Sequence, residues 1–251
     1  MTSLKIIIST TSIAFILLSI GLAFCGYLFL RAFRKGDGSQ SKIGLLVSML
    51  FLGFAFQTGV ILGGGTAFFA GNPTGLFFVL IAANSFLTLI AMFSIYVAYY
   101  IFAPRTSPVP VIVLTAMIGI ASVILQIITH PQPHITPQGG VDWGMSFLLS
   151  LLTFYLLFIS IGSQAYIFIK LFFQAATRQI KLLSFLFGTI ATIGILVQFV
   201  QFVVLYRVST DIRIRVYDVG TGLLGVGLII AIVLLSLLFR KRSVVDKEKT
   251  S

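Results

Sequence analysis

Few residues in this sequence carry side chains that can do chemistry near neutral pH. Both histidines, His130 and His134, lie in one proline-rich segment, HPQPHITPQGG, and the acidic residue nearest to them is Asp142. A pH-sensing or metal-sensing role is one interpretation of this pair, and solvated loop histidines are the simpler one. The single cysteine, Cys25, cannot form an internal disulfide and is expected to pack between helices. We expect no metal site.

The acidic residues exclude several classes of membrane protein. All six are expected in loops, in the tail or at the mouth of a helix: Asp37, Asp142, Asp211, Asp218, Asp246 and Glu248. Ion-coupled transporters, proton pumps and voltage sensors generally carry charges within the membrane. A retinal protein needs a lysine in the last helix, and none lies between Asp218 and Arg240. Intramembrane metalloproteases and haem proteins need ligands at helical spacing, so we expect no enzymatic activity and no cofactor.

Uncharged polar residues within the apolar segments give one candidate ligand pocket. Seven of them are expected in the outer half of the chain's helices or near mid-depth: Gln57, Asn84, Ser85, Gln126, Tyr155, Gln198 and Gln201. Gln198 and Gln201 are three residues apart and share a helix face. These side chains either form an outward-facing polar pocket or only bond one another and fix helix register, each bond contributing about 0.6 kcal/mol.

The elements that must position these residues are membrane-spanning helices. The chain has 251 residues, is 58% hydrophobic and only 9% charged, and has a mean hydropathy of +1.11. A spanning helix needs about 20 apolar residues, and the apolar runs are continuous rather than alternating, which excludes barrel strands. We therefore predict a single all-α domain over 1–242, a seven-helix bundle with a short charged tail at 243–251. The predicted helices cover 5–34, 42–66, 74–103, 108–129, 144–173, 179–206 and 217–241.

Charge sets the expected orientation of this bundle. With the N-terminus outside, Lys5, Arg207, Arg213 and Arg215 fall on the outer side and the other thirteen of the 17 Lys and Arg residues fall inside. An excess of Lys and Arg on the cytoplasmic side is the rule for multi-pass proteins. The net charge of +11 then forms a cytoplasmic rim that faces anionic lipid headgroups. We expect a cell-membrane protein that does not bind nucleic acid.

Two further segments have expected structural roles. In the outer loop RVSTDIRIRVYD, residues 207–218, charged and apolar residues alternate, which predicts a short strand or an interfacial segment in which Asp211 and Asp218 pair with the arginines. In the last span, Gly220, Gly222, Gly225 and Gly227 are expected to allow close helix approach.

The layout also resembles a known sensor module. The seven helices, the outside N-terminus, the basic first inner loop RAFRKGDGSQSK and the basic turn ATRQIKLLSFLFG together look like the seven-helix module at the front of some bacterial and archaeal histidine kinases. The resemblance covers most of the chain and implies a sensor. After Arg242 only SVVDKEKTS follows, so signalling is expected to use a separate protein partner at the inner loops.

Three functions therefore stay open. The first is a receptor-like or sensor-like module without enzymatic activity. The second is an accessory or structural subunit of a larger membrane complex. The third is a lipid or small-molecule carrier that works without intramembrane charges.

Overall fold

Seven long apolar helices form the described part of the chain. The computed structural model describes residues 9–33, 38–174, 178–208 and 210–248, and in it seven helices are long and apolar enough to cross a membrane. The prediction of an all-α, seven-helix membrane bundle is confirmed. The helices are α1 (Thr10–Phe33), α2 (Gly38–Phe56), α4 (Pro73–Phe102), α5 (Val109–Thr129), α6 (Phe147–Gln174), α7 (Arg178–Phe199) and α8 (Thr210–Glu248).

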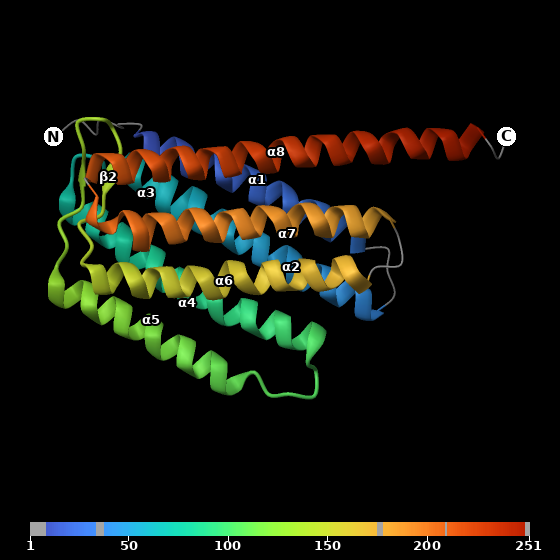
Figure 1. Ribbon diagram of the computed structural model, residues 1–251, viewed down its shortest axis with the longest axis horizontal. Coiled ribbons are helices and arrows are strands. Elements are labelled where there is room, and N and C mark those ends of the chain that lie inside the picture. The colour runs from blue at the N-terminus through green and yellow to red at the C-terminus, as the bar shows by residue number, and fades with distance from the viewer. Residues whose placement is uncertain (1–8, 34–37, 175–177, 209, 249–251) are drawn as a thin grey trace.

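Six of these helices form a closed ring. The contacts run from α1 to α2, α4, α6, α7 and α8, and α8 returns to α1. Helix α5 lies outside this ring, packs on α4 and α6, and has the smallest buried share of the seven spans. Helix α8 runs past the other helices at one end of the molecule (Figure 1).

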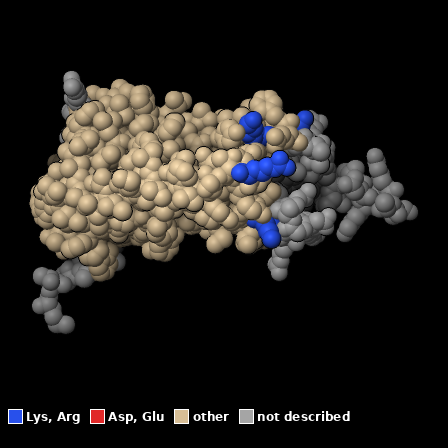
Figure 2. All heavy atoms as spheres, turned by 90° about the horizontal axis from the view of Figure 1, so that it is seen from below, with Lys and Arg blue, Asp and Glu red and all other residues tan. Residues whose placement is uncertain are grey.

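The two ends of the bundle differ in chemistry. One end, which we call the hairpin end, is covered by the antiparallel strands β1 (His134–Ile135) and β2 (Val141–Asp142). At the opposite, basic end, exposed Lys and Arg side chains gather on the face seen in Figure 2. Among the side chains that the structure describes, the exposed basic residues near this end are Arg31, Lys42, Arg105, Lys170 and Lys181.

Two spans contain π-helical segments. In the second span α2 continues as the π-helix η1 (Gln57–Gly64) and then as α3 (Gly65–Phe68), and α7 continues as the π-helix η2 (Val200–Val204) and the 3₁₀ turn η3 (Leu205–Arg207). Glycines in η1 allow α1 to come close: a Cβ on Gly63 would lie 2.9 Å from Ile16 Cγ1. Such segments are rare in helices and frequent at functional sites.

The turn before α4 is set by local sequence. Asn72 caps the helix, since its side chain accepts a hydrogen bond from the Gly75 N–H at 3.1 Å, and Pro73 occupies the first turn. Proline is favoured there because its missing N–H has no intrahelical partner in any case. The turn is shorter than the glycine-rich sequence suggested, because the second span stays helical to Phe68.

The start of α8 corrects one prediction. Residues from Thr210 onward are helical, so the predicted strand in 207–218 is wrong. Arg213 forms an ion pair with Asp142 of β2 at 3.2 Å, whereas Asp218 accepts hydrogen bonds from threonine hydroxyls of α1. The predicted pairing of Asp218 with the arginines is therefore wrong, and the side chain of Asp211 lies outside the described residues. The helix is favoured because it pairs the backbone N–H and C=O groups of an apolar segment with one another.

Glycine lets α1 and α8 pack backbone against backbone. A Cβ on Gly225 would lie 2.6 Å from Leu18 N and 2.8 Å from the Leu17 carbonyl carbon. A Cβ on Gly227 would meet nothing within 4 Å. Among the glycines predicted to allow close approach in the last span, Gly225 is thus the one that touches the backbone of a neighbouring helix.

Candidate functional site

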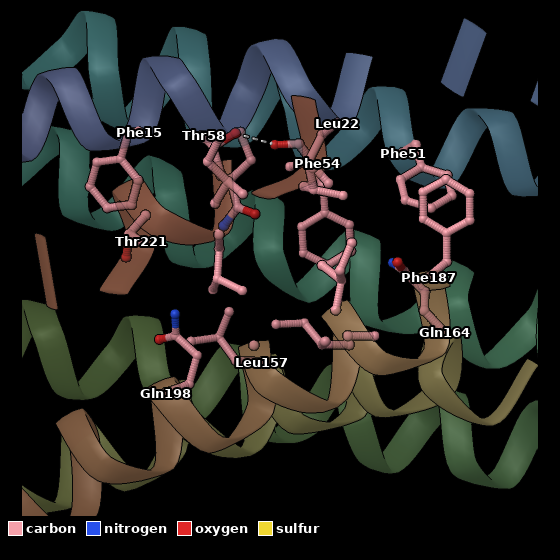
Figure 3. A pocket seen from close by; sticks show the side chains of 18 of the residues that line it. Phe15, Leu22, Phe51, Phe54, Thr58, Leu157, Gln164, Phe187, Gln198 and Thr221 are labelled. Carbon is pink, nitrogen blue, oxygen red and sulfur yellow. Dashed lines mark hydrogen bonds between the residues drawn. The ribbon is translucent and has the colours of Figure 1, made fainter. Parts of the chain in front are cut away.

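The candidate site is a cavity inside the ring of helices. It has a volume of about 120 Å³ and is bounded by α1, α2 with η1, α6, α7 and α8. We call it the central cavity (Figure 3). Its walls are largely apolar. The lining includes aromatic rings, aliphatic side chains and polar side chains, of which the aromatic ones are Phe15, Phe51, Phe54, Phe168, Phe187 and Tyr217.

The polar groups in the central cavity fall into two kinds. Gln57 Nε2 donates to the Ala83 carbonyl at 3.1 Å, and Thr58 Oγ1 donates to the Phe54 carbonyl at 2.8 Å, so these side chains are used by the helices themselves. In contrast, Gln164 Nε2, Gln198 Oε1 and Thr221 Oγ1 are buried without a hydrogen-bond partner among the described residues.

Unpartnered polar atoms in this position have a physical cost. Leaving a buried donor or acceptor without a partner costs about 1–3 kcal/mol, and most buried polar groups in proteins are paired. The Tyr217 hydroxyl lies near the Gln198 and Thr221 side chains, but Gln198 Oε1 and Thr221 Oγ1 have no hydrogen bond of ordinary geometry among the described residues. Since Gln164, Gln198 and Thr221 all line the same cavity, an occupant of that cavity is a natural partner for them.

The unpartnered groups lie at different depths. In Figure 3 Gln198 and Thr221 lie toward one end of the cavity and Gln164 lies toward the other. A Cβ on Gly194 of α7 would lie 3.9 Å from Ile161 of α6, so these two residues lie at about the same level along the bundle axis. Gln164 follows Ile161 by three residues toward the basic end, and Gln198 follows Gly194 by four toward the hairpin end. At 1.5 Å per residue the two amides are about 10 Å apart along the bundle axis.

Aromatic rings close the cavity toward the basic end. Phe29, Phe51, Phe168 and Phe187 form a cluster in which ring centroids lie 5.4 to 6.0 Å apart. Cys25, which is fully buried, belongs to the same apolar core. We call these four rings the phenylalanine plug. Packed aromatic rings at these distances attract one another beyond the burial of their surface, so the plug is a stable wall.

Toward the hairpin end, Tyr217 separates the central cavity from a smaller one. The Tyr217 ring packs edge-on against Phe15 of α1, with centroids 5.7 Å apart. It also lines a second cavity of about 20 Å³, which Gln201 and Arg213 border as well. Tyr217 is therefore the wall shared by the two cavities.

A hydrogen-bonded network holds the hairpin over this end. The Thr10 N–H donates to the Gly139 carbonyl at 2.9 Å, and the Val141 N–H donates to Thr11 Oγ1 at 2.9 Å. Thr11 Oγ1 in turn donates to Asp218 Oδ1 at 2.8 Å, and Asp218 is only 8% exposed. One buried carboxylate thus joins α8, α1 and β2.

The structure brings together only part of the predicted pocket. Of the seven predicted residues, Gln57 and Gln198 line the central cavity. Gln201 lines the smaller cavity instead, with its Oε1 unpartnered. The prediction used depth along the helix, whereas the direction of each side chain around the helix decides which interface it enters.

The other predicted residues lie elsewhere. Asn84 Nδ2 donates to Thr153 Oγ1 at 3.4 Å across the contact of α4 with α6. Ser85 is exposed on the outer surface of α4. Gln126 is fully buried on α5, outside the ring, and Tyr155 is half-buried and lines neither cavity. The seven residues therefore do not form one polar layer.

Sequence reasoning missed Gln164, Tyr217 and Thr221. Gln164 lies in the inner half of its span, away from the depth at which the pocket is predicted. Tyr217 and Thr221 stand near the start of the predicted last helix, but α8 begins at Thr210, so both lie about two to three turns into it. A search for every uncharged polar residue within an apolar run would have found Gln164 and Thr221.

The described residues offer no cluster for a metal ion. No group of three or more His, Cys, Asp and Glu side chains lies together in the described ranges. His130 ends α5 in a left-handed conformation, with a φ of 42°, and packs on Phe77 with centroids 4.6 Å apart. His134 lies on β1 with an exposed side chain.

Comparisons with known proteins found no relative of this chain. No family model, no curated protein sequence and no solved structure matches the chain. The geometry of the central cavity is therefore the basis for a functional proposal.

Proposed function

We propose that this multi-pass membrane protein is a receptor-like sensor that binds a small molecule in the central cavity. The observation that carries the proposal is the presence of three unpartnered buried polar atoms, on Gln164, Gln198 and Thr221, in one cavity with apolar walls. Ligand sites in proteins typically combine apolar walls with a few convergent polar groups. Five helices border this cavity, so an occupant contacts elements that reach both ends of the bundle.

The proposal includes an orientation in the cell membrane. The basic end faces the cytoplasm and anionic lipid headgroups, and the hairpin end faces outward. The support is the set of exposed Lys and Arg residues at one end, since cytoplasmic loops are enriched in them. A separate protein partner at the basic end would receive the signal, as the resemblance to histidine-kinase sensor modules implies.

A sensor accounts for the closed walls better than a carrier does. The phenylalanine plug closes the cavity toward the basic end, and Tyr217 with Phe15 closes it toward the hairpin end. A carrier must open each of these walls in turn, whereas a sensor needs only a change in helix packing when the cavity fills. An accessory subunit could use the peripheral helix α5 to contact its complex, but this hypothesis gives the unpartnered polar atoms no role.

Filling the cavity by mutation tests the proposal. The Cβ of a larger residue at Gly194 would make only ordinary contacts, at 3.9 Å to Ile161 and 4.0 Å to Leu224, and would point into the cavity. We expect Gly194→Leu to fold and to lose bound small molecules. The wild type and the variant are purified gently from the native membrane, and co-purifying small molecules are compared by mass spectrometry.

The matched control is Gly227→Leu. It makes the same chemical change on an exposed position of α8 with nothing within 4 Å, and we expect it to retain whatever the wild type binds. A molecule that co-purifies equally with all three proteins would refute the central cavity as the site. Stoichiometric recovery with subunits of a larger complex, and no cavity-dependent molecule, would establish the accessory role instead.

A further inference from the structure

We infer that the ligand of the central cavity is a short, linear, uncharged molecule with a hydrogen-bonding group, such as a hydroxyl, at each end. This inference rests on the proposed function and names the class of ligand. Three properties of the cavity support it, namely the absence of charge in its wall, its length, and the position of its unpartnered groups.

The lining excludes a charged ligand. Every residue that borders the central cavity is uncharged. Moving an ion from water into such a site without a partner of opposite charge is very costly. The nearest acidic side chain on α8 is Asp218, which does not line the cavity and whose carboxylate is engaged by Thr10 and Thr11.

The dimensions favour a chain over a ring system. An apolar cavity of about 150 Å³ admits one benzene molecule, so about 120 Å³ holds roughly the same number of non-hydrogen atoms. The two amides, however, are about 10 Å apart along the axis. A small volume spread over that length fits an extended molecule of small cross-section.

The two ends of the cavity require hydrogen-bonding groups on the ligand. Gln164 Nε2 lies at one end, and Gln198 Oε1 with Thr221 Oγ1 lies at the other. Each amide carries both a donor and an acceptor, and the assignment of its nitrogen and oxygen follows from its neighbours. A hydroxyl donates and accepts, so it satisfies either orientation of either amide.

The wall that α6, α7 and α8 form between the two amides is apolar, and it includes Leu157, Ile161, Ala191, Gly194 and Leu224. On the side of η1, Gln57 and Thr58 donate to backbone carbonyls of the helices. Neither side of the middle therefore presents an unpartnered donor. The corresponding part of the ligand is therefore a hydrocarbon chain, whose transfer from water supplies about 0.8 kcal/mol per buried CH₂.

A series of linear diols tests the ligand class. The wild-type protein is placed in lipid nanodiscs, and thermal unfolding is followed by the emission of Trp143, the single tryptophan, with the diols from ethanediol to decanediol. We expect stabilisation to peak between butanediol and hexanediol, with a rise in Tm of about 5 °C near saturation. Pentanol, which has one hydroxyl, should raise Tm less than pentanediol, and pentanoate should not raise it.

Variants then assign the two ends. Gln164→Leu and Gln198→Leu are each expected to weaken pentanediol binding about threefold to tenfold, the effect of one lost hydrogen bond, and to make pentanol and pentanediol stabilise the variant equally. Gln126→Leu is the control, because Gln126 is also buried and unpartnered but lies on α5 outside the ring. It should keep the wild-type preference.

The failures of the two proposals are distinguishable. Stabilisation that simply increases with chain length, in wild type and Gly194→Leu alike, would show partition into lipid and overturn the ligand class. A molecule that is lost in Gly194→Leu, combined with no response to any diol, would preserve the proposed function and overturn the class. No cavity-dependent molecule and no diol response would mean that water fills the cavity, and both proposals would fail.

Discussion

At the scale of single residues, Thr11 links three elements through one hydroxyl. Its hydroxyl accepts from the Val141 N–H at 2.9 Å and donates to Asp218 at 2.8 Å, so one side chain connects β2, α1 and α8. Asp218 is an acidic residue near the end of an apolar span, and its burial is tolerable because Thr10 and Thr11 both donate to it. The network fixes the hairpin over the bundle.

Removal of the Thr11 hydroxyl tests this role. Thr11→Val keeps the shape but leaves the Val141 N–H and part of the Asp218 carboxylate unpaired, so we expect a loss of about 1–3 kcal/mol in the free energy of unfolding. Thr189→Val is the control, because Thr189 is exposed and donates only to Phe185 of its own helix. Unfolding in mild detergent measures both, and an equal effect of the two changes would contradict the structural role of Thr11.

At the scale of elements, π-helical segments adjoin three of the polar side chains that line the central cavity. Gln57 and Thr58 open η1, and Gln198 lies just before η2. A π-turn rotates the residues after it relative to a regular α-helix, so a sequence read at constant helical periodicity puts those residues on the wrong face. This explains why Gln198 and Gln201, which share a face in a regular helix, border two different cavities.

The contact of α1 with α8 depends on the missing side chain of Gly225. We expect Gly225→Ala to destabilise the protein by about 1–3 kcal/mol, because the added methyl group would meet the backbone of Leu17 and Leu18 and backbone cannot rotate away. Gly227→Ala makes the same change where nothing lies within 4 Å, and its effect should stay within about 0.5 kcal/mol. Thermal unfolding of the two variants in the same detergent measures both effects. A similar loss of stability in both would show that the close contact at Gly225 is not important for packing.

At the scale of the whole molecule, the asymmetry of charge is the basis for the proposed orientation. The single native cysteine is buried, so wild type serves as an unlabelled background for membrane-impermeant maleimide on intact cells. His134→Cys, on the exposed hairpin, should be labelled from outside, and Ser107→Cys, between α4 and α5 at the basic end, should be labelled only after lysis. The reverse pattern would mean that the basic end faces outward.

The sequence alone determined the number of spans and their approximate limits. Those properties depend on composition within short windows, since about 20 apolar residues in a row have no other stable environment than lipid. It also placed both histidines in a loop and Gln57 and Gln198 within spans, because polarity and depth are read directly along the chain.

Only the tertiary structure decided which side chains meet. Whether Asn84, Gln126 or Gln164 faces the cavity depends on helix rotation, on the π-segments and on which helices are neighbours in the ring, and none of these is a local property. The partners of Asp218 and Arg213 were mispredicted for the same reason. The hydrogen bond of Asp218 joins residues 207 positions apart along the chain and the ion pair of Arg213 joins residues 71 positions apart, and such contacts exist only once the helices have packed.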